Sequence, residues 1–201
     1  MPKEFELKYR AGDAVIDAIR AYYGEFREIS METTYYGTPS GSLSRRKWTL
    51  RRRMENNVSV CTLKTPGGTY SRNEFEVEAE DIHSAIDLLC AQGAPEELNN
   101  VVKEGIAPIC GAKFTRLAKT LVLEDLTVEL ALDRGWLTGG GRVLPFCEVE
   151  AELKEGTEEA ALAFAGKLSA QFGLVPESRS KFARALALAD LSETKEKEHG
   201  L

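Results

Sequence analysis

Alternation between charged and apolar residues is the feature that most restricts what this chain can fold into. From Lys3 to Arg10, the pattern places Glu4, Glu6 and Lys8 on one side of an extended chain and apolar residues on the other. Side chains two residues apart in a β-strand point the same way, so this spacing predicts a half-buried strand. The spacing recurs along the chain and indicates a sheet with one ionic face and one apolar face.

Turn-forming clusters of Gly, Pro, Asn and Ser separate about eight such segments. Strands are predicted at 3–10, 28–36, 47–54, 58–65, 72–80, 112–123, 126–133 with a brief extension at 135–138, and 143–153. Helical periodicity predicts helices at 13–23, 81–90, 158–172 and 180–191, with another short one after residue 90. Short connections favour antiparallel pairing. The predicted class is α+β, with one domain over 1–191 and a charged, disordered tail over 192–201.

Further ionic rows lie on the other predicted strands. They are Arg51 with Arg53, Glu74 with Glu76 and Glu78, Glu129 with Asp133, and Glu148 with Glu150 and Glu152. Each row could face water on an open sheet. Alternatively, the sheet closes into an antiparallel β-barrel whose interior holds the rows, while helices packed outside cover the apolar faces. The apolar strand faces need cover and the amphipathic helices can supply it, which favours the barrel.

An interior that contains both signs of charge must hold water or a bound ligand, because unpaired buried charge is costly. Carboxylates are suitable ligands for hard cations such as Mg²⁺ or Mn²⁺. Arginine and lysine pair with phosphate oxygens. Together the rows predict a site for a metal-bound polyphosphate. The cysteines, Cys61, Cys90, Cys110 and Cys147, form no CxxC pair, which argues against a structural zinc site and indicates reduced thiols.

Composition narrows the class of partner and the compartment. The formal net charge of -6 and the pI of about 5.2 argue against a surface that wraps duplex nucleic acid. No apolar run approaches the roughly 20 residues that cross a bilayer, and the N-terminus lacks a secretion signal. We therefore predict a cytoplasmic protein with no membrane partner.

Specific motifs follow one another along nearly the whole chain. They are Glu4-Phe5-Glu6-Leu7-Lys8, Tyr35-Tyr36-Gly37-Thr38-Pro39, Leu50 to Arg53, Thr62-Leu63-Lys64, Arg72-Asn73-Glu74-Phe75, Glu129 to Asp133, Cys147 to Leu153 and Ser180-Lys181. In this order they resemble the CYTH, or triphosphate tunnel metalloenzyme, superfamily, whose most specific mark is an ExExK motif. Within the superfamily, the residues of these motifs are most similar to those of bacterial inorganic triphosphatases.

The resemblance implies a closed eight-stranded antiparallel tunnel that cleaves inorganic triphosphate to pyrophosphate and phosphate with Mg²⁺ or Mn²⁺. It assigns the metal to Glu4, Glu6, Glu148 and Glu150, supported by Glu129 and Asp133. It assigns the triphosphate to Arg51, Arg53, Lys64, Arg116 and Lys181, with Glu74 orienting one of these cations. Lys8 either binds phosphate or helps to activate water, and it joins Glu4, Glu6, Glu148 and Glu150 in the implied catalytic set.

Three other functions remain open at this point. A class IV adenylyl cyclase would use the same tunnel on ATP, and a thiamine triphosphatase would need aromatic contacts that Trp48 or Trp136 could supply. A non-catalytic module could bind polyphosphate or nucleotide without turnover. Also open are a homodimer and the membership of several charged residues in the site, namely Glu76, Glu78, Glu152, Lys119 and Arg184.

Overall fold

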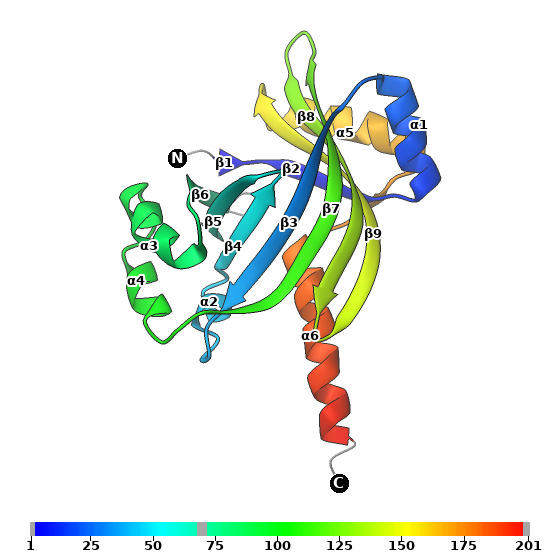
Figure 1. Ribbon diagram of the computed structural model, residues 1–201. Helices are drawn as coiled ribbons and strands as arrows, with labels where there is room; N and C mark the ends of the chain where they lie inside the picture. The colour runs from blue at the N-terminus through cyan, green and yellow to red at the C-terminus, as the bar shows by residue number, and fades with distance from the viewer. Residues whose placement is uncertain (1–2, 68–71, 199–201) are drawn as a thin grey trace.

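A curved antiparallel sheet forms the centre of the molecule (Figure 1). The computed structural model describes the backbone of residues 3–67 and 72–198 and the side chains of residues 5–67 and 72–189. The strands are β1 (Lys3–Glu4), β2 (Glu6–Arg10), β3 (Arg27–Gly37), β4 (Thr49–Glu55), β5 (Val58–Pro66), β6 (Arg72–Glu78), β7 (Ala107–Val122), β8 (Thr127–Gly139), β9 (Arg142–Glu155) and β10 (Val175–Pro176). The helices are α1 (Asp13–Tyr23), α2 (Ser42–Arg45), α3 (Ile82–Ala91), α4 (Glu97–Val102), α5 (Glu158–Phe172) and α6 (Lys181–Glu198).

The predicted α+β class is confirmed, with two local differences. A strand at 126–133 and a separate brief extension at 135–138 were expected, but β8 runs from Thr127 to Gly139 without a break. Gly135 does not interrupt the strand. A Cβ atom at Gly135 would lie 2.2 Å from the carbonyl oxygen of Lys113, so glycine allows β7 and β8 to approach closely. Helix α2 was not predicted, because four residues are too few to show helical periodicity.

The strand order brings the N-terminal segment against two separate parts of the sheet. The order is β1-β6-β5-β4-β3-β7-β8-β9-β2-β10, in which β1 and β10 contribute two residues each. β1 pairs with β6, and β2 pairs with β9. Only Phe5 separates β1 from β2 in the sequence. One short segment therefore contacts strands that lie far apart in the strand order.

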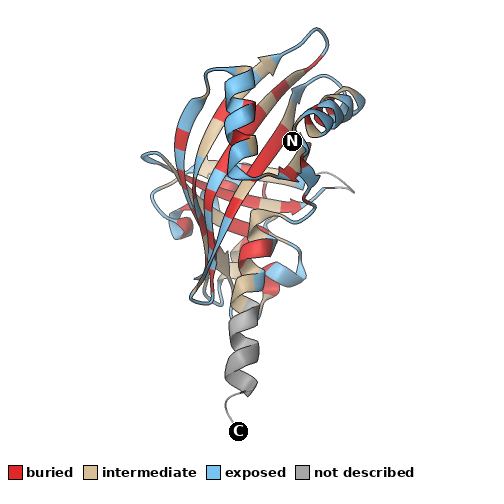
Figure 2. Cartoon of the chain, turned by 90° about the vertical axis from the view of Figure 1, so that its right-hand side faces the viewer, coloured by how far each residue is buried: buried red, intermediate tan, exposed pale blue. Residues whose placement is uncertain are grey.

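Helices cover the apolar, convex face of the sheet in two places. Helices α3 and α4 pack on β4 to β6 over side chains such as Leu63 and Phe75. Helices α1 and α5 pack on β2, β8 and β9 over side chains such as Leu130 and Val149. Buried and exposed positions alternate along the strands beneath them (Figure 2). This part of the fold follows the expected arrangement of helices outside and charges inside.

Helix α6 departs from that arrangement, and the prediction that all helices pack outside is wrong for it. Leu137 and Gly139 follow Asp133 at period two, so they share its charged, concave side of β8. Leu137 and Ala112 pack in one buried cluster with Ala185 of α6. Helix α6 therefore lies on the concave side at one end of the sheet. The inward positions there are small or apolar instead of charged, so a helix can pack on them.

We expect Gly139→Ala to destabilise the protein by about 1–3 kcal/mol, the usual effect of overpacking. A Cβ atom at Gly139 would lie 2.3 Å from the carbonyl oxygen of Ala185, and backbone on both sides leaves it little freedom to move. Urea unfolding measures the change. The matched control is Gly166→Ala, because a Cβ atom there meets nothing within 4 Å. Equal stability of the two variants would contradict the close packing of α6 on β8.

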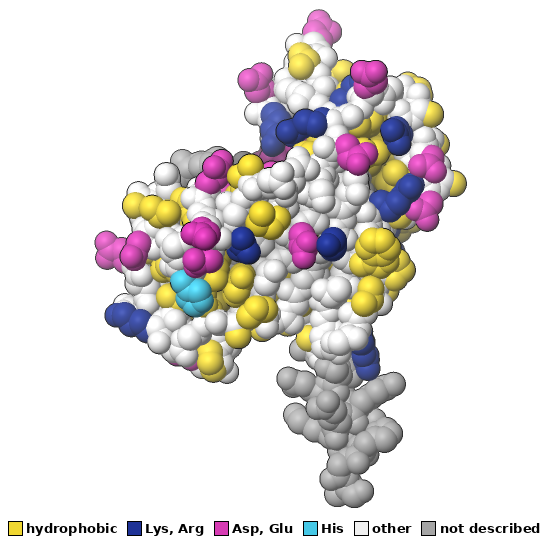
Figure 3. Space-filling view, in the orientation of Figure 1, with side chains coloured by type: hydrophobic (Ala, Val, Ile, Leu, Met, Phe, Trp, Pro, Cys, Tyr) yellow, Lys and Arg dark blue, Asp and Glu magenta, His cyan; other side chains and the backbone are white. Residues whose placement is uncertain are grey.

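The face visible in Figure 3 carries acidic and basic side chains interspersed with apolar ones, without one large patch of a single sign. Charged side chains of opposite sign also pair on the surface, as in the exposed ion pair of 3.1 Å between Lys113 of β7 and Glu32 of β3. Among the helices of the described residues, none is long and apolar enough to cross a membrane.

Candidate functional site

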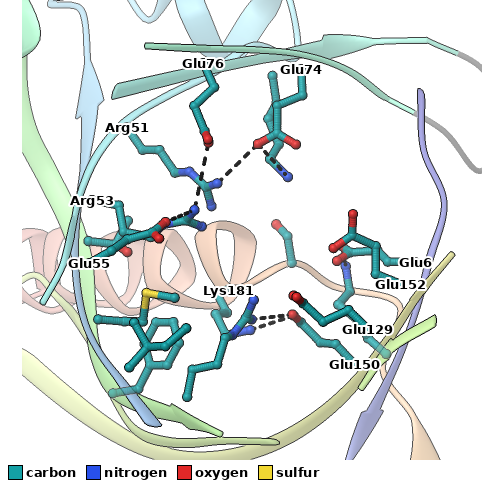
Figure 4. Close-up of a pocket in the computed structure, with 18 of the residues that line it drawn as sticks. Glu6, Arg51, Arg53, Glu55, Glu74, Glu76, Glu129, Glu150, Glu152 and Lys181 are labelled. Carbon is teal, nitrogen blue, oxygen red and sulfur yellow. Dashed lines mark hydrogen bonds and ion pairs between the residues drawn. The ribbon is translucent and has the colours of Figure 1, made fainter. Parts of the chain in front are cut away.

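A charged cavity of about 290 Å³ lies on the concave side of the sheet. Side chains from β2 to β9 and from the start of α6 line it. Figure 4 shows Glu6, Glu129, Glu150 and Glu152 on one side of this cavity and the β4 arginines on the other. The cavity thus has an acidic wall and a basic wall that face each other.

The acidic wall contains a row of carboxylates on neighbouring strands. Glu6 of β2 lies directly opposite Glu152 of β9, which lies directly opposite Glu129 of β8. Like charges in such cross-strand positions repel each other. Lys8 contacts Glu6 at 3.1 Å, and Lys154 contacts Glu152 at 2.7 Å. These lysines offset part of the negative charge, and further positive charge would stabilise the row.

The basic wall is formed by β4 and β5. Arg51 and Lys64 both contact Glu74 of β6, at 3.3 Å and 3.4 Å, so this carboxylate holds two cations in place. Arg53 contacts Glu55 and lies 3.8 Å from Glu76. The Nε atom of Arg53 is buried and has no hydrogen-bond partner among the described residues. A buried donor without a partner is costly, so an anion in the cavity would satisfy it.

Behind the acidic wall lies a buried carboxylate cluster formed by Asp133, Glu148 and Glu150, with ligand oxygens within 4.8 Å of one another. The Lys181 ammonium contacts all three carboxylates. Its nitrogen lies 2.8 Å from an oxygen of Asp133 and 2.7 Å from an oxygen of Glu150.

Two arginines complete the charge balance of the carboxylate cluster. Arg116 donates to both oxygens of Asp133, at 2.8 Å and 2.7 Å, and also contacts Glu150. Arg184 contacts Glu148. Three carboxylates therefore face three cations, which is the condition under which buried charge is tolerated.

The carboxyl groups of this cluster titrate in opposite directions. Burial raises the pKa of Glu148 to about 7; Lys181 and Arg184 oppose the rise, while the neighbouring Glu150 adds to it. Burial also acts to raise the pKa of Glu150, but Lys181 and Arg116 outweigh it and hold this pKa well below its ordinary value. Environments that separate two neighbouring carboxyl groups in this way are characteristic of acid–base sites.

The raised pKa of Glu148 predicts how stability changes with pH. Between the ordinary value of 4.5 and about 7, folded Glu148 keeps a proton that the unfolded chain has released. Folding stability therefore falls as pH rises through this window, while the contribution of Glu150, with its lowered pKa, is already complete there. In chelator, we expect wild type to lose on the order of 1–3 kcal/mol more than Glu148→Gln between about pH 5 and pH 8 in urea unfolding. Parallel pH profiles would mean that Glu148 is ionised throughout.

The donor set fits a hard divalent cation at the acidic wall. The row of Glu6, Glu152 and Glu129 offers carboxylate oxygens, the ligands that Mg²⁺ and Mn²⁺ prefer. The buried carboxylate cluster is different, because Lys181 already occupies its centre. A cation could approach that cluster only after the Lys181 ammonium moves away.

Most of the residues singled out in the sequence come together in the structure. Those that line the cavity are Glu6, Lys8, Arg51, Arg53, Lys64, Glu74, Arg116, Glu129, Glu150 and Lys181. Asp133 and Glu148 are fully buried just behind the lining. The backbone of Glu4 belongs to β1, while its side chain lies outside the described residues.

Of the charged residues whose membership in the site was undecided from the sequence, some line the cavity and others do not. Glu76 and Glu152 line the cavity. Glu78 lines a neighbouring depression that shares Glu76 with the cavity. Lys119 lies elsewhere, where its ammonium donates to the carbonyl oxygens of Tyr23, the last residue of helix α1, and of Glu25 beyond it. Arg184 reaches the site only through Glu148.

The charged rows of the sequence do not reveal one wall of the cavity. Strand β3 turns Ile29, Met31 and Tyr35 toward the cavity, so its inward face is mainly apolar. An apolar inward face looks the same in the sequence as an apolar outward face. The inward face of β3 can be identified only from its pairing register with β4, the strand that carries Arg51 and Arg53. The apolar side chains of β3 separate the basic wall from the acidic one.

The sequence is similar to that of a known protein family. The CYTH domain family matches residues 2–186. The inorganic triphosphatase of Haemophilus influenzae is 26% identical over 197 residues, which cover 94% of this chain and 55% of that protein. The chain thus spans about half the length of this curated relative.

Solved structures share the fold at low sequence identity. The Hippeastrum protein HpAC1, an adenylyl cyclase by name with a dominant triphosphatase activity, superposes with a TM-score of 0.68 at 16% identity, covering 94% of this chain and 97% of that one. The PH1819 protein of Pyrococcus horikoshii superposes with a TM-score of 0.60 at 26% identity, covering 92% and 98%.

Proposed function

The chain belongs to the CYTH domain family, and from this premise we propose that it hydrolyses inorganic triphosphate to pyrophosphate and phosphate with the help of Mg²⁺ or Mn²⁺. The observation that carries the proposal is the cavity in which the acidic row of β2, β8 and β9 faces the basic side chains of β4 and β5. A metal-bound polyanion needs both walls, whereas an anion alone needs only the basic one. The inorganic triphosphatase activity of the Haemophilus relative supports the same reaction.

We further propose that the sheet closes into an eight-stranded tunnel around this cavity. The support is the N-terminal segment, which pairs with β6 through β1 and with β9 through β2, with only Phe5 between the two. A closed tunnel would exclude bulk water from the charged walls and strengthen their interactions with substrate. Helix α6 would then occupy one end of the tunnel, and substrate would enter from the other.

In this proposal the basic wall binds the triphosphate. Arg51, Arg53 and Lys64 neutralise the charge that develops on the leaving pyrophosphate, and Glu74 holds Arg51 and Lys64 in position. Arg116 and Lys181 contact the phosphates from the acidic side of the cavity.

The acidic side binds the cation. Glu4, Glu6, Glu129 and Glu150 would hold it, with Glu152 of the same row and with Asp133 and Glu148 behind them. When bound, the metal supplies a Lewis acid that polarises the phosphoryl group and lowers the pKa of the attacking water.

We assign Lys8 to phosphate binding and not to proton removal. Burial acts to lower the pKa of Lys8, but Glu6 and Glu150 outweigh it and raise the pKa. Lys8 therefore stays an ammonium group at neutral pH and has no free lone pair to accept a proton. The carboxylate cluster offers the better candidate base.

The two tryptophans do not supply the aromatic contacts that thiamine triphosphate would need. Trp48 packs beside the cluster under α3 and α4. Trp136 is exposed on β8 and lines a different depression. The aromatic side chains of the cavity lining are Tyr35 and Phe114, so the choice between inorganic and organic triphosphates is left to the measurement.

Phosphate release from inorganic triphosphate, ATP and thiamine triphosphate, measured in parallel with Mg²⁺, Mn²⁺ or a chelator, tests the proposed function. We expect fast cleavage of inorganic triphosphate that stops in chelator. Preference for an organic triphosphate would change the substrate but keep the site. Formation of cyclic AMP would indicate a cyclase, and tight binding without product would indicate a binding module.

A further inference from the structure

Each carboxylate of the buried cluster has two cationic partners among the described residues. Lys181 is the partner that all three share. Asp133 and Glu150 also contact Arg116. For Glu148, the second cation is Arg184. Removal of Lys181 from the cluster would therefore leave every carboxylate with one arginine.

Lys181 and Arg184 approach Glu148 from the same helix but have different access to the cavity. They lie three residues apart on α6, so they point to the same side of the helix. Lys181 contacts one carboxylate oxygen of Glu148 and also lines the cavity. Arg184 contacts the other oxygen, has a side chain that is only 6% exposed, and does not line the cavity.

Arg184 lies where it does not reach the cavity. Its guanidinium carbon lies 5.4 Å from the centre of the Phe146 ring, a cation–π arrangement on the same strand as Glu148. Its neighbour Ala185 is fully buried against the sheet. Lys181 also lies over Phe146, at 5.6 Å, but it lines the cavity, where a substrate could contact it. The two cations are thus a cavity-side partner and a rear partner of one carboxylate.

We propose that Arg184 is a positioning residue that holds the Glu148 carboxyl group in place while Lys181 moves from the carboxylate cluster to the bound triphosphate. This inference rests on the proposed function. Lys181 cannot bind phosphate with the same hydrogens that it now donates to three carboxylates. A buried carboxylate that lost its only cation would be strongly destabilised. Arg184 limits this cost by leaving Glu148 with one cation, as Arg116 does for Asp133 and Glu150.

The test is a double-mutant cycle between Arg184→Met and Glu148→Gln, with Arg184→Lys as the conservative variant. Because Arg184 acts on a carboxylate from behind the site, we expect Arg184→Met to lower kcat for inorganic triphosphate by about 10- to 100-fold, as outer-shell changes do. KM should stay within about twofold of wild type, because Arg184 makes no contact with the cavity. Arg184→Lys should recover part of kcat.

In the Glu148→Gln background, Arg184→Met should have almost no further effect, since the carboxylate on which it acts is gone. Arg20→Met, an exposed arginine on α1, is the control for loss of a helical arginine. A raised KM with unchanged kcat, an equal loss in both backgrounds, or wild-type kinetics in Arg184→Met would each overturn the positioning role. If wild type cleaves no triphosphate at all, the proposed function fails as well, so the two failures are distinguishable.

Discussion

Glu148→Gln is expected to reduce metal-dependent turnover of inorganic triphosphate on the order of 10³-fold. Glu148 is fully buried, and both of its oxygens accept from cations of α6. Glutamine fills nearly the same space but is neutral. Its amide nitrogen can only donate hydrogen bonds, so it would face the N–H groups of Lys181 or Arg184 without accepting from them. The substitution therefore removes a charge from the reacting side of the site without opening a cavity.

The measurement is initial-rate phosphate release with Mg²⁺ and with Mn²⁺. The matched control is Glu155→Gln, which makes the same chemical change at an exposed position of the same strand and should keep wild-type rates. Urea unfolding should show that both variants fold. Near-normal turnover by Glu148→Gln would remove this residue from the reaction and leave Glu150 as the principal carboxylate of β9.

Lys181→Met is expected to cause the largest loss of stability, about 3–5 kcal/mol, as well as loss of turnover. Methionine keeps the apolar stem but leaves three buried carboxylates with only Arg116 and Arg184 to balance them. The destabilisation should be greater above pH 7 than below it. It should shrink as pH falls, because protonation of Glu148, whose pKa is already raised to about 7, removes the excess negative charge.

Two further variants make this result specific. Lys167→Met, at an exposed position on α5, controls for the loss of a helical lysine and should unfold like wild type. Glu150→Gln in the Lys181→Met background should restore part of the stability, because it brings acids and bases back into balance. A Lys181→Met protein within about 1 kcal/mol of wild type would show that the ammonium is not needed to hold the cluster together.

Local pattern was enough to predict much of this site. Whether a side chain of a strand shares the face of its neighbours depends only on period-two geometry, so Arg51 with Arg53 and Glu148 with Glu150 could be grouped from the sequence. The resemblance to the CYTH family then implied that these groups share one cavity; among the described side chains, Asp133 and Glu148 lie behind the lining, and the roles of the residues stay predictions.

Strand pairing determined which groups meet. Glu6, Glu152 and Glu129 come from segments far apart in the chain, and only the register of β2, β9 and β8 places them in one row. Strand pairing also determines that Ile29 and Met31 point into the cavity. The sequence does not show this, because apolar side chains pack on both faces of the sheet.

The class of fold, the alternation of faces and the charge content of the site could be predicted, because they depend on spacing along the chain. The packing of α6 on the concave side and the place of Lys181 among three carboxylates depend instead on contacts between distant segments. An amphipathic helix shows which of its sides is apolar, but not which surface that side will cover. That choice depends on the small inward residues at the end of β7 and β8, such as Ala112 and Gly139, which leave room for a helix only after the sheet has curved around them.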